Sequence, residues 1–175
     1  MVNMDILDIL KNRNIDTDVH NLIRIAAKRL GATQDIINLC REIISSKEDD
    51  WWMQGAVYAI SEDLNRTEDF TRELLSTIEK YQWDAFPDTA IASFSALGIY
   101  ANRSEDKYII GELTKCLFEE IEEFDKNVGS RRPVRLEVIC RSLDVSLRGP
   151  EGIYRPLRVS RPEDIPDYLL SHVDD

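Results

Sequence analysis

The sequence predicts an all-α fold, a short right-handed α-solenoid of antiparallel helix hairpins with an irregular C-terminal tail. Three observations predict it. Apolar residues recur at the three- and four-residue spacing of amphipathic helices along most of the chain. Helix breakers are few, with 7 glycines and 6 prolines in 175 residues. A two-helix pattern also returns at intervals of 34, 37 and 44 residues, which is typical of α-solenoids.

The first predicted hairpin follows a short amphipathic stretch at residues 3–13. Its first helix is expected to start at residues 16–18 and to end before Gly31, a residue suited to the left-handed turn after a helix. Thr33 is expected to cap the second helix, whose apolar stripe ends at residue 44. Only two or three residues connect the two helices, which predicts an antiparallel hairpin.

The second predicted hairpin opens with the acid pair Asp49-Asp50, which suits a helix N-terminus. Its first helix carries an apolar face as far as Leu64, and its partner helix is expected over residues 67–83. The apolar stripe of this partner helix is expected at Phe70, Leu74, Ile78 and Tyr81, which are in helical register.

The third predicted hairpin begins at Pro87, because proline is favoured at the first position of a helix. Small residues follow as far as Gly98, so a neighbouring helix is expected to approach closely there. The partner helix is expected to start after a cap at residues 104–106 and is the longest in the chain. A further helix is predicted over residues 133–147.

The chain is expected to form a helical domain at residues 1–148 and a tail at 149–175 that packs on it. Glycine and proline break the helical pattern in the tail, and one or two helical turns are predicted at 167–172. We expect no signal peptide and no membrane span, because no stretch approaches the roughly 20 apolar residues that a span needs. A cytoplasmic location is expected, since three well-separated cysteines at apolar positions indicate reduced core residues: Cys40, Cys116 and Cys140.

The recurring first helices are rich in small residues and end in a Leu-Gly or similar turn. Together with two helices per unit, this pattern resembles HEAT repeats over about residues 16–147, although the proline and Asp/Arg pattern of HEAT units is present only in part. The resemblance implies a stack in which the second helices line a concave face. An ordinary α-helical bundle without a true repeat is the alternative. The aligned segments are 24–31, 58–65, 95–102 and 139–146.

The net charge of −11 is unevenly distributed along the chain. Residues 31–65, 104–129 and 162–175 each carry −5, whereas residues 130–161 carry +5 and contain arginine as their only basic residue. An acidic surface repels phosphate, so a basic protein is the expected partner, and nucleic acid and membranes are not. The arginines are expected to pair with the acidic helix over 119–125. An acidic partner surface and a phosphate or nucleic-acid site are the alternatives.

A partner-binding surface is predicted on the polar faces of the second helices. Each residue turns the helix by 100°, and this rotation identifies the residues that lie away from the apolar stripe. Trp83 lies opposite its helix's stripe, so it forms a hot spot beside carboxylates or folds back on the core. The predicted residues are Arg72, Glu79, Trp83 and Asp84 on one helix and Tyr108, Glu112, Glu119 and Glu122 on the next. Trp51 and Trp52 cannot both face inward, so one is expected in the core and the other exposed or packed on the preceding hairpin.

These features predict a non-enzymatic protein-binding module without a metal, a cofactor or catalytic residues. The two histidines, His20 and His172, lack a metal-ligand spacing, and no Gly-rich phosphate loop is present. His20 is expected on the helix surface or in packing. In size and charge the chain resembles bacterial immunity proteins, which bind and neutralise toxins that are often basic nucleases.

Two other classes of function remain as alternatives. The first is a HEAT-like enzyme or lyase-type module that acts on a nucleobase or a chromophore. HEAT-like DNA glycosylases are larger and strongly basic, so the charge of −11 argues against that class. The second is a structural subunit whose exposed surface is an oligomer interface, and the oligomeric state stays open.

Overall fold

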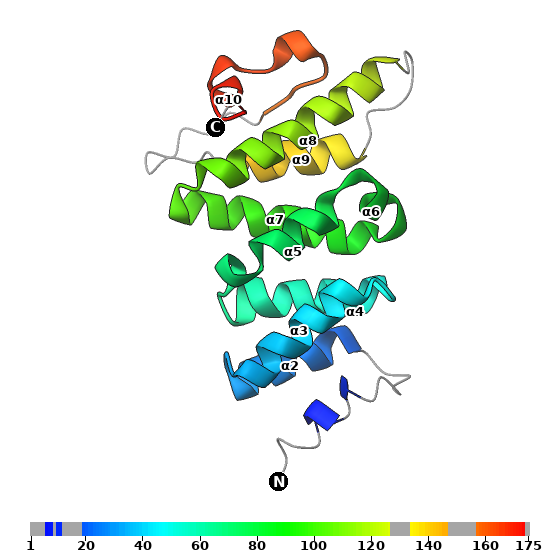
Figure 1. Cartoon of the computed structure of the whole chain (residues 1–175). Helices are drawn as coiled ribbons and strands as arrows, with labels where there is room; N and C mark the ends of the chain where they lie inside the picture. The colour runs from blue at the N-terminus through cyan, green and yellow to red at the C-terminus, as the bar shows by residue number, and fades with distance from the viewer. Residues whose placement is uncertain (1–5, 9, 12–18, 127–133, 147–156, 174–175) are drawn as a thin grey trace. The chain divides into compact units, whose positions relative to one another are not determined.

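The computed structural model describes most of the chain, and every described element is helical (Figure 1). The prediction of an all-α fold is therefore confirmed. The chain divides into two compact units, Met1–Ala96 and Leu97–Asp175. The predicted domain boundary at residues 148–149 and the predicted helix start at 16–18 lie outside the described residues, which are 6–8, 10–11, 19–126, 134–146 and 157–173.

The described residues of the first unit form a helical stretch at residues 6–8 and 10–11, six longer α-helices or parts of them, and two short helical turns. Helices α2 and α3 both pack on α4, and α3 also contacts α5. Aliphatic side chains from these helices form the core, which includes the fully buried Ile23, Met53 and Leu74. The elements are α2 (Val19–Leu30), α3 (Gln34–Ser46), α4 (Asp50–Tyr58), the π-helical turn η1 (Ala59–Asp63), the 3-10 turn η2 (Thr67–Phe70), α5 (Thr71–Ile78), α6 (Lys80–Ala85) and, as far as Ala96, α7 (Pro87–Ser104).

Local sequence signals account for the helix ends between α2 and α4. Gly31 has a φ of 65°, the left-handed conformation that the sequence predicted after α2. Asp49 caps α4, because its Oδ1 accepts a hydrogen bond of 3.0 Å from the backbone N–H of Trp52. This bond satisfies one of the amide groups that have no partner within the helix.

Asp50 connects the beginnings of two helices. It is the first residue of α4, and its carboxylate accepts hydrogen bonds from the backbone N–H groups of Asp88 at 3.0 Å and Thr89 at 2.8 Å. The Thr89 hydroxyl lies 2.6 Å from the same carboxylate. Helix α7 begins at Pro87, as predicted. The first amides of α7 are therefore capped by a side chain that lies 38 residues earlier in the sequence.

The partner helix expected over residues 67–83 is broken, so the prediction of one continuous helix is wrong. Glu79 has a φ of −56° and a ψ of 148°, an extended conformation that separates α5 from α6. Neither glycine nor proline marks this position. The break changes which side chains face inward: Tyr81, expected on the apolar stripe, is 57% exposed, whereas Gln82 is buried.

The second unit is organised around α8. Helix α9 packs on α8, and the two short elements of the C-terminal segment, η3 and α10, also contact it. Helix α10 falls within the helical turns predicted at residues 167–172. Buried side chains of the C-terminal segment, Val159 and Leu169, contribute to the core. The elements are α7 from Leu97 onward, α8 (Lys107–Lys126), α9 (Val134–Ser146), η3 (Pro162–Asp164) and α10 (Asp167–Leu170).

Two glycines of the second unit permit close approach of other backbone segments. At Gly98 a Cβ atom would lie 2.6 Å from the carbonyl oxygen of Ser142 in α9. At Gly111 it would collide with the carbonyl oxygen of His172. The close approach that the small residues of α7 predicted therefore occurs at Gly98.

Candidate partner-binding surfaces

The four predicted binding residues of the first unit do not share one helical ridge. Arg72 lies on α5, whereas Trp83 and Asp84 lie on α6, beyond the break at Glu79. Arg72, Glu79 and Asp84 are exposed, but Trp83 is half-buried. Its ring meets the ring of the buried Phe94 edge-on, with 6.4 Å between their centres. Of the two positions predicted for Trp83, the structure therefore has the one that folds back on the core.

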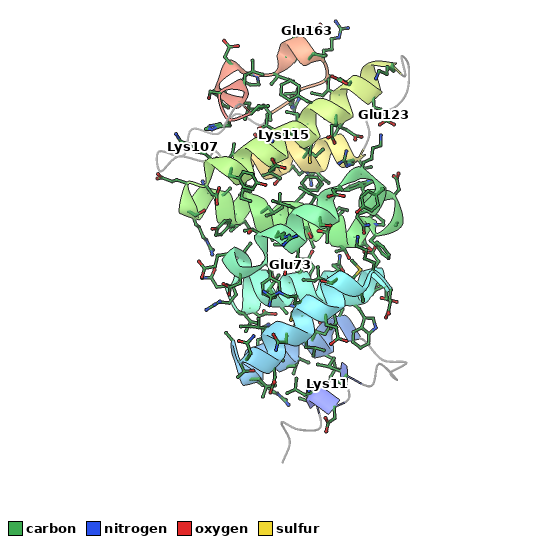
Figure 2. All side chains as sticks on the ribbon, in the orientation of Figure 1. Lys11, Glu73, Lys107, Lys115, Glu123 and Glu163 are labelled. Carbon is green, nitrogen blue, oxygen red and sulfur yellow. The ribbon has the colours of Figure 1, made fainter. Side chains whose placement is uncertain are left out.

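The four predicted residues of the second unit lie on α8 at helical spacing, so they follow one face of a continuous helix. Tyr108 is 60% exposed, and Glu119 and Glu122 are exposed as well. Glu112 is half-buried and forms an ion pair of 2.7 Å with Lys115 (labelled in Figure 2). The hydrogen bond and the charge of Glu112 raise the pKa of Lys115. We call these five residues the α8 ridge.

Glu120 is next to Glu119 in sequence but faces the core, where it forms a buried ion pair. Arg135 Nη1 of α9 lies 2.6 Å from Glu120 Oε2, and the two side chains are 3% and 8% exposed. This pair confirms that the Arg-rich segment pairs with the acidic helix at one position. Arg141 instead pairs with Glu137 on its own helix. Four of the eight arginines lie outside the described residues: Arg131, Arg132, Arg148 and Arg155.

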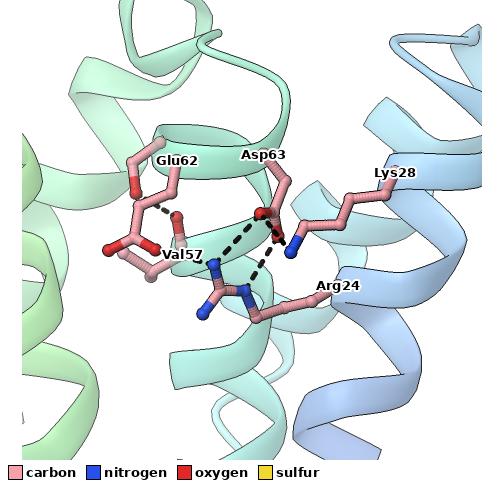
Figure 3. Close-up of polar contacts among 6 residues, drawn as sticks. Arg24, Lys28, Val57, Glu62 and Asp63 are labelled. Atoms are coloured by element: carbon pink, nitrogen blue, oxygen red, sulfur yellow. Dashed lines mark hydrogen bonds and ion pairs between the residues drawn. The ribbon is translucent and has the colours of Figure 1, made fainter.

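A second charged cluster connects α2 to η1 in the first unit (Figure 3). Arg24 donates to both carboxylate oxygens of Asp63, at 2.8 and 3.0 Å, and to Glu62 at 2.7 Å. Lys28 Nζ lies 3.4 Å from Asp63, and the Arg24 guanidinium lies 5.4 Å from the centre of the Tyr58 ring. A bidentate guanidinium–carboxylate pair has a defined geometry. This cluster therefore holds the π-helical turn against α2.

Low pH is expected to destabilise the first unit through protonation of Asp63. Burial alone would raise the pKa of this carboxyl, but the hydrogen bonds and charges of Arg24 and Lys28 lower it below its ordinary value. A group with a lowered folded pKa contributes stability above its unfolded pKa, and this contribution is lost as pH falls through the folded pKa. We therefore expect the free energy of unfolding to decrease below about pH 4. Asp63→Asn should remove this part of the pH dependence.

Urea unfolding at a series of pH values, followed by tryptophan fluorescence, measures this effect, because all three tryptophans lie in the first unit. Glu68→Gln removes an exposed carboxylate of the same unit and serves as the control. Identical pH profiles for the wild type and Asp63→Asn would contradict the prediction.

His20 lies on α2 and packs against α4. The His20 ring contacts Trp51 and Tyr58 edge-on, with 5.6 and 5.5 Å between ring centres. His20 is therefore a packing residue, as predicted. Trp51 is 61% exposed and Trp52 is half-buried, so the two rings do face different environments. The exposed Trp51 packs on the preceding hairpin through His20, as expected of one of the pair, whereas Trp52 is only partly buried.

A pocket that sequence reasoning missed lies at the connection between α3 and α4. It has a volume of about 200 Å³, and none of the eight predicted binding residues lines it. The available signal was a tryptophan that follows two acidic residues at a helix start. The lining residues are Ile43, Ser46, Glu48, Asp49 and Trp52.

The cysteines are free thiols. Cys40 and Cys140 are buried, whereas Cys116 is half-buried. Burial raises the pKa of Cys40 to about 12 and that of Cys116 to about 11, so both side chains are protonated at neutral pH.

In the part of the chain that the structure describes, no three His, Cys, Asp or Glu side chains are grouped as metal ligands. The helices of that part include none with the length and apolar character to cross a membrane. No protein-family model matches the chain, and neither a curated protein nor a solved structure matches it. The fold and the surfaces described above therefore provide the basis for a functional proposal.

Proposed function

We propose that this chain is a non-enzymatic binding protein that holds a basic protein partner against the α8 ridge. The observation that carries the proposal is that the acidic residues of α8 occupy two different faces, one buried and one exposed. Glu120 is used internally by Arg135, while Tyr108, Glu119 and Glu122 are exposed on another face. An exposed aromatic ring beside charged groups is typical of binding hot spots. The net charge of −11 would attract a basic partner and speed its association.

The scaffold we propose is a short HEAT-like stack of helix hairpins in the cytoplasm. Its support is the recurrence of a two-helix pattern in the sequence. In such a stack α8 would be a second helix and would contribute to the concave face. Because size and charge resemble those of bacterial immunity proteins, we propose a toxin, such as a basic nuclease, as the class of partner.

The test compares capture of basic proteins by the wild type and by the double variant Glu119→Lys/Glu122→Lys. Captured proteins are identified by mass spectrometry, and their affinities are then measured by titration at low salt. We expect the variant to bind roughly tenfold more weakly, because two attractive charges on the ridge become repulsive. The loss should shrink as salt is added, since salt screens exposed charges.

The matched control is Asp35→Lys/Glu68→Lys, which changes the net charge equally at exposed positions of the first unit. Circular dichroism checks that both variants are folded. An equal loss of affinity in the two variants would show that only the overall charge matters and would contradict a role for the α8 ridge. Failure of the wild-type chain to retain any basic protein would contradict the proposal as a whole.

A further inference from the structure

We infer that the π-helical turn η1 is a latched element with two arrangements: ion pairs to Arg24 hold it in its wide form, and without them it rewinds into a continuation of α4. The latch lies in the first unit and shares no residue with the α8 ridge. The inference therefore goes beyond the proposed function and does not depend on it. Its basis is a set of backbone hydrogen bonds that an α-helix would not make, together with the side chains that favour them.

The backbone hydrogen bonds of η1 span more residues than those of an α-helix. The Leu64 N–H donates to the carbonyl of Ala59 at 2.9 Å, whereas an α-helix would direct it to the carbonyl of Ile60. That carbonyl instead accepts a hydrogen bond of 2.7 Å from the N–H of Arg66. Rewinding as an α-helix would give Leu64 the Ile60 carbonyl and turn the following residues by about 100°. The Arg66 amide would then lose its bond, so the two arrangements differ in identifiable hydrogen bonds.

The hydroxyl of Ser61 weakens the α-helical alternative at the same place. It donates to the carbonyl of Val57 at 2.8 Å (Figure 3). In an α-helix this carbonyl accepts the backbone N–H of Ser61. A serine that bonds back to the preceding turn in this way slightly destabilises a helix and often bends it. This small effect makes the widened turn accessible without fixing it.

The wide form has a cost that other contacts must offset. Turns of the π-helical type are rare in proteins. Asn65, two residues after η1, has a φ of 51°, in the left-handed region that is unfavourable for residues with a Cβ atom. A continued α-helix needs no widened turn. It is therefore the arrangement that we expect this stretch to adopt when the offsetting contacts are removed.

The ion pairs of Arg24 are those contacts. The guanidinium binds both carboxylate oxygens of Asp63 and one of Glu62, so two consecutive side chains of η1 are fixed to α2. The Asp63 side chain is 4% exposed, so solvent screens this pair little. Rewinding would turn Asp63 by up to about 100° around the helix axis and break the bidentate contact. Because this contact forms only in the wide form, it shifts the equilibrium toward that form.

The latch also affects how the chain enters the next helix. Arg66 immediately precedes η2, and its carbonyl accepts a hydrogen bond of 3.1 Å from the N–H of Asp69. The bond from the Arg66 N–H to Ile60 therefore connects η1 to the first turn of the following element. Loss of the Arg24 ion pairs should loosen this connection, whereas α4 itself should stay helical.

The experiment observes the two arrangements directly in the full-length chain labelled with ²H, ¹³C and ¹⁵N. NMR detects scalar couplings across hydrogen bonds, so it identifies which carbonyl each amide uses. In the wild type, Leu64 should couple to Ala59. The variant Arg24→Met keeps an apolar stem and removes the charge, and in it Leu64 should couple to Ile60 instead. The coupling from Arg66 should disappear, and its amide hydrogen should exchange at least tenfold faster.

Asp63→Ala removes the same ion pair from the other side and should give the same change of couplings. It provides the test if Arg24→Met does not fold. The matched control is Arg29→Met, which makes the same substitution at an exposed position of α2 and should keep the couplings of the wild type. Circular dichroism checks that each variant is folded.

Unchanged couplings at Leu64 in a folded Arg24→Met or Asp63→Ala protein would overturn the inference, because η1 would then keep its wide form without the ion pairs. The same change of couplings in Arg29→Met would also overturn it, since the effect would follow from the loss of any charge on α2. Unfolding of both Arg24→Met and Asp63→Ala would show that the pair supports the whole unit and is not a latch. No partner is needed, so these results are independent of the test of the α8 ridge.

Discussion

Glu120→Gln is expected to lower the free energy of unfolding of the second unit by about 3 kcal/mol, within the range for a buried ion pair that loses one partner. The guanidinium of Arg135 would stay buried, with its side chain 3% exposed, but without the opposite charge 2.6 Å away. Urea unfolding followed by circular dichroism measures the loss. Hydrogen exchange of the α8 and α9 amides assigns it to this unit.

Glu119→Gln is the matched control, because Glu119 is the exposed neighbour on the same helix. It should change stability by less than about 0.5 kcal/mol. The double variant Glu120→Leu/Arg135→Met should recover much of the loss, since an apolar pair buries no charge. If Glu120→Gln costs no more than Glu119→Gln, the ion pair does not stabilise the unit.

Gly98→Val is expected to destabilise the second unit by about 3 kcal/mol, the upper part of the range for overpacking. Its Cβ would lie 2.6 Å from the carbonyl oxygen of Ser142. That atom belongs to the backbone of α9 and cannot rotate away, so the two helices must separate. Gly98→Ala should cost less, because alanine recovers about 1 kcal/mol of helix propensity.

Thermal and urea unfolding measure this effect. Ser95→Val places the same side chain at an exposed position of α7 and should be nearly neutral. A Gly98→Val protein as stable as Ser95→Val would show that α9 can shift at little cost, contrary to the close approach described above.

Most helices could be predicted from the sequence because their apolar spacing and end signals agree. Gly31, Asp49 and Pro87 each mark an end that the structure contains. The break at Glu79 could not be predicted, because a residue of ordinary helix propensity adopts an extended ψ of 148° there without a glycine or proline signal. Trp83 follows that break. Its orientation therefore could not be predicted by continuing the 100° rotation per residue of α5.

The candidate sites show a similar limit. The pairing of the Arg-rich segment with the acidic helix was predictable from charge, but the choice of Glu120 over Glu119 was not. These neighbours differ by one step of 100° around α8, and the packing of α9 decides which of them is buried. The pocket at Trp52 could not be predicted from the sequence for another reason. Its walls come from two helices and the turn between them, so it depends on how the helices pack.

The bonds from Asp50 to the first turn of α7 have a consequence for how this protein tolerates change. These bonds fix the position of the first turn of α7 directly against α4. That position therefore does not depend on the 28 intervening residues of η1, η2, α5 and α6. Loops lengthen at little thermodynamic cost when their ends are held elsewhere. The exposed break at Glu79 is therefore a place where residues can be inserted while α7 keeps its starting point, and a natural position for a tag or a reporter.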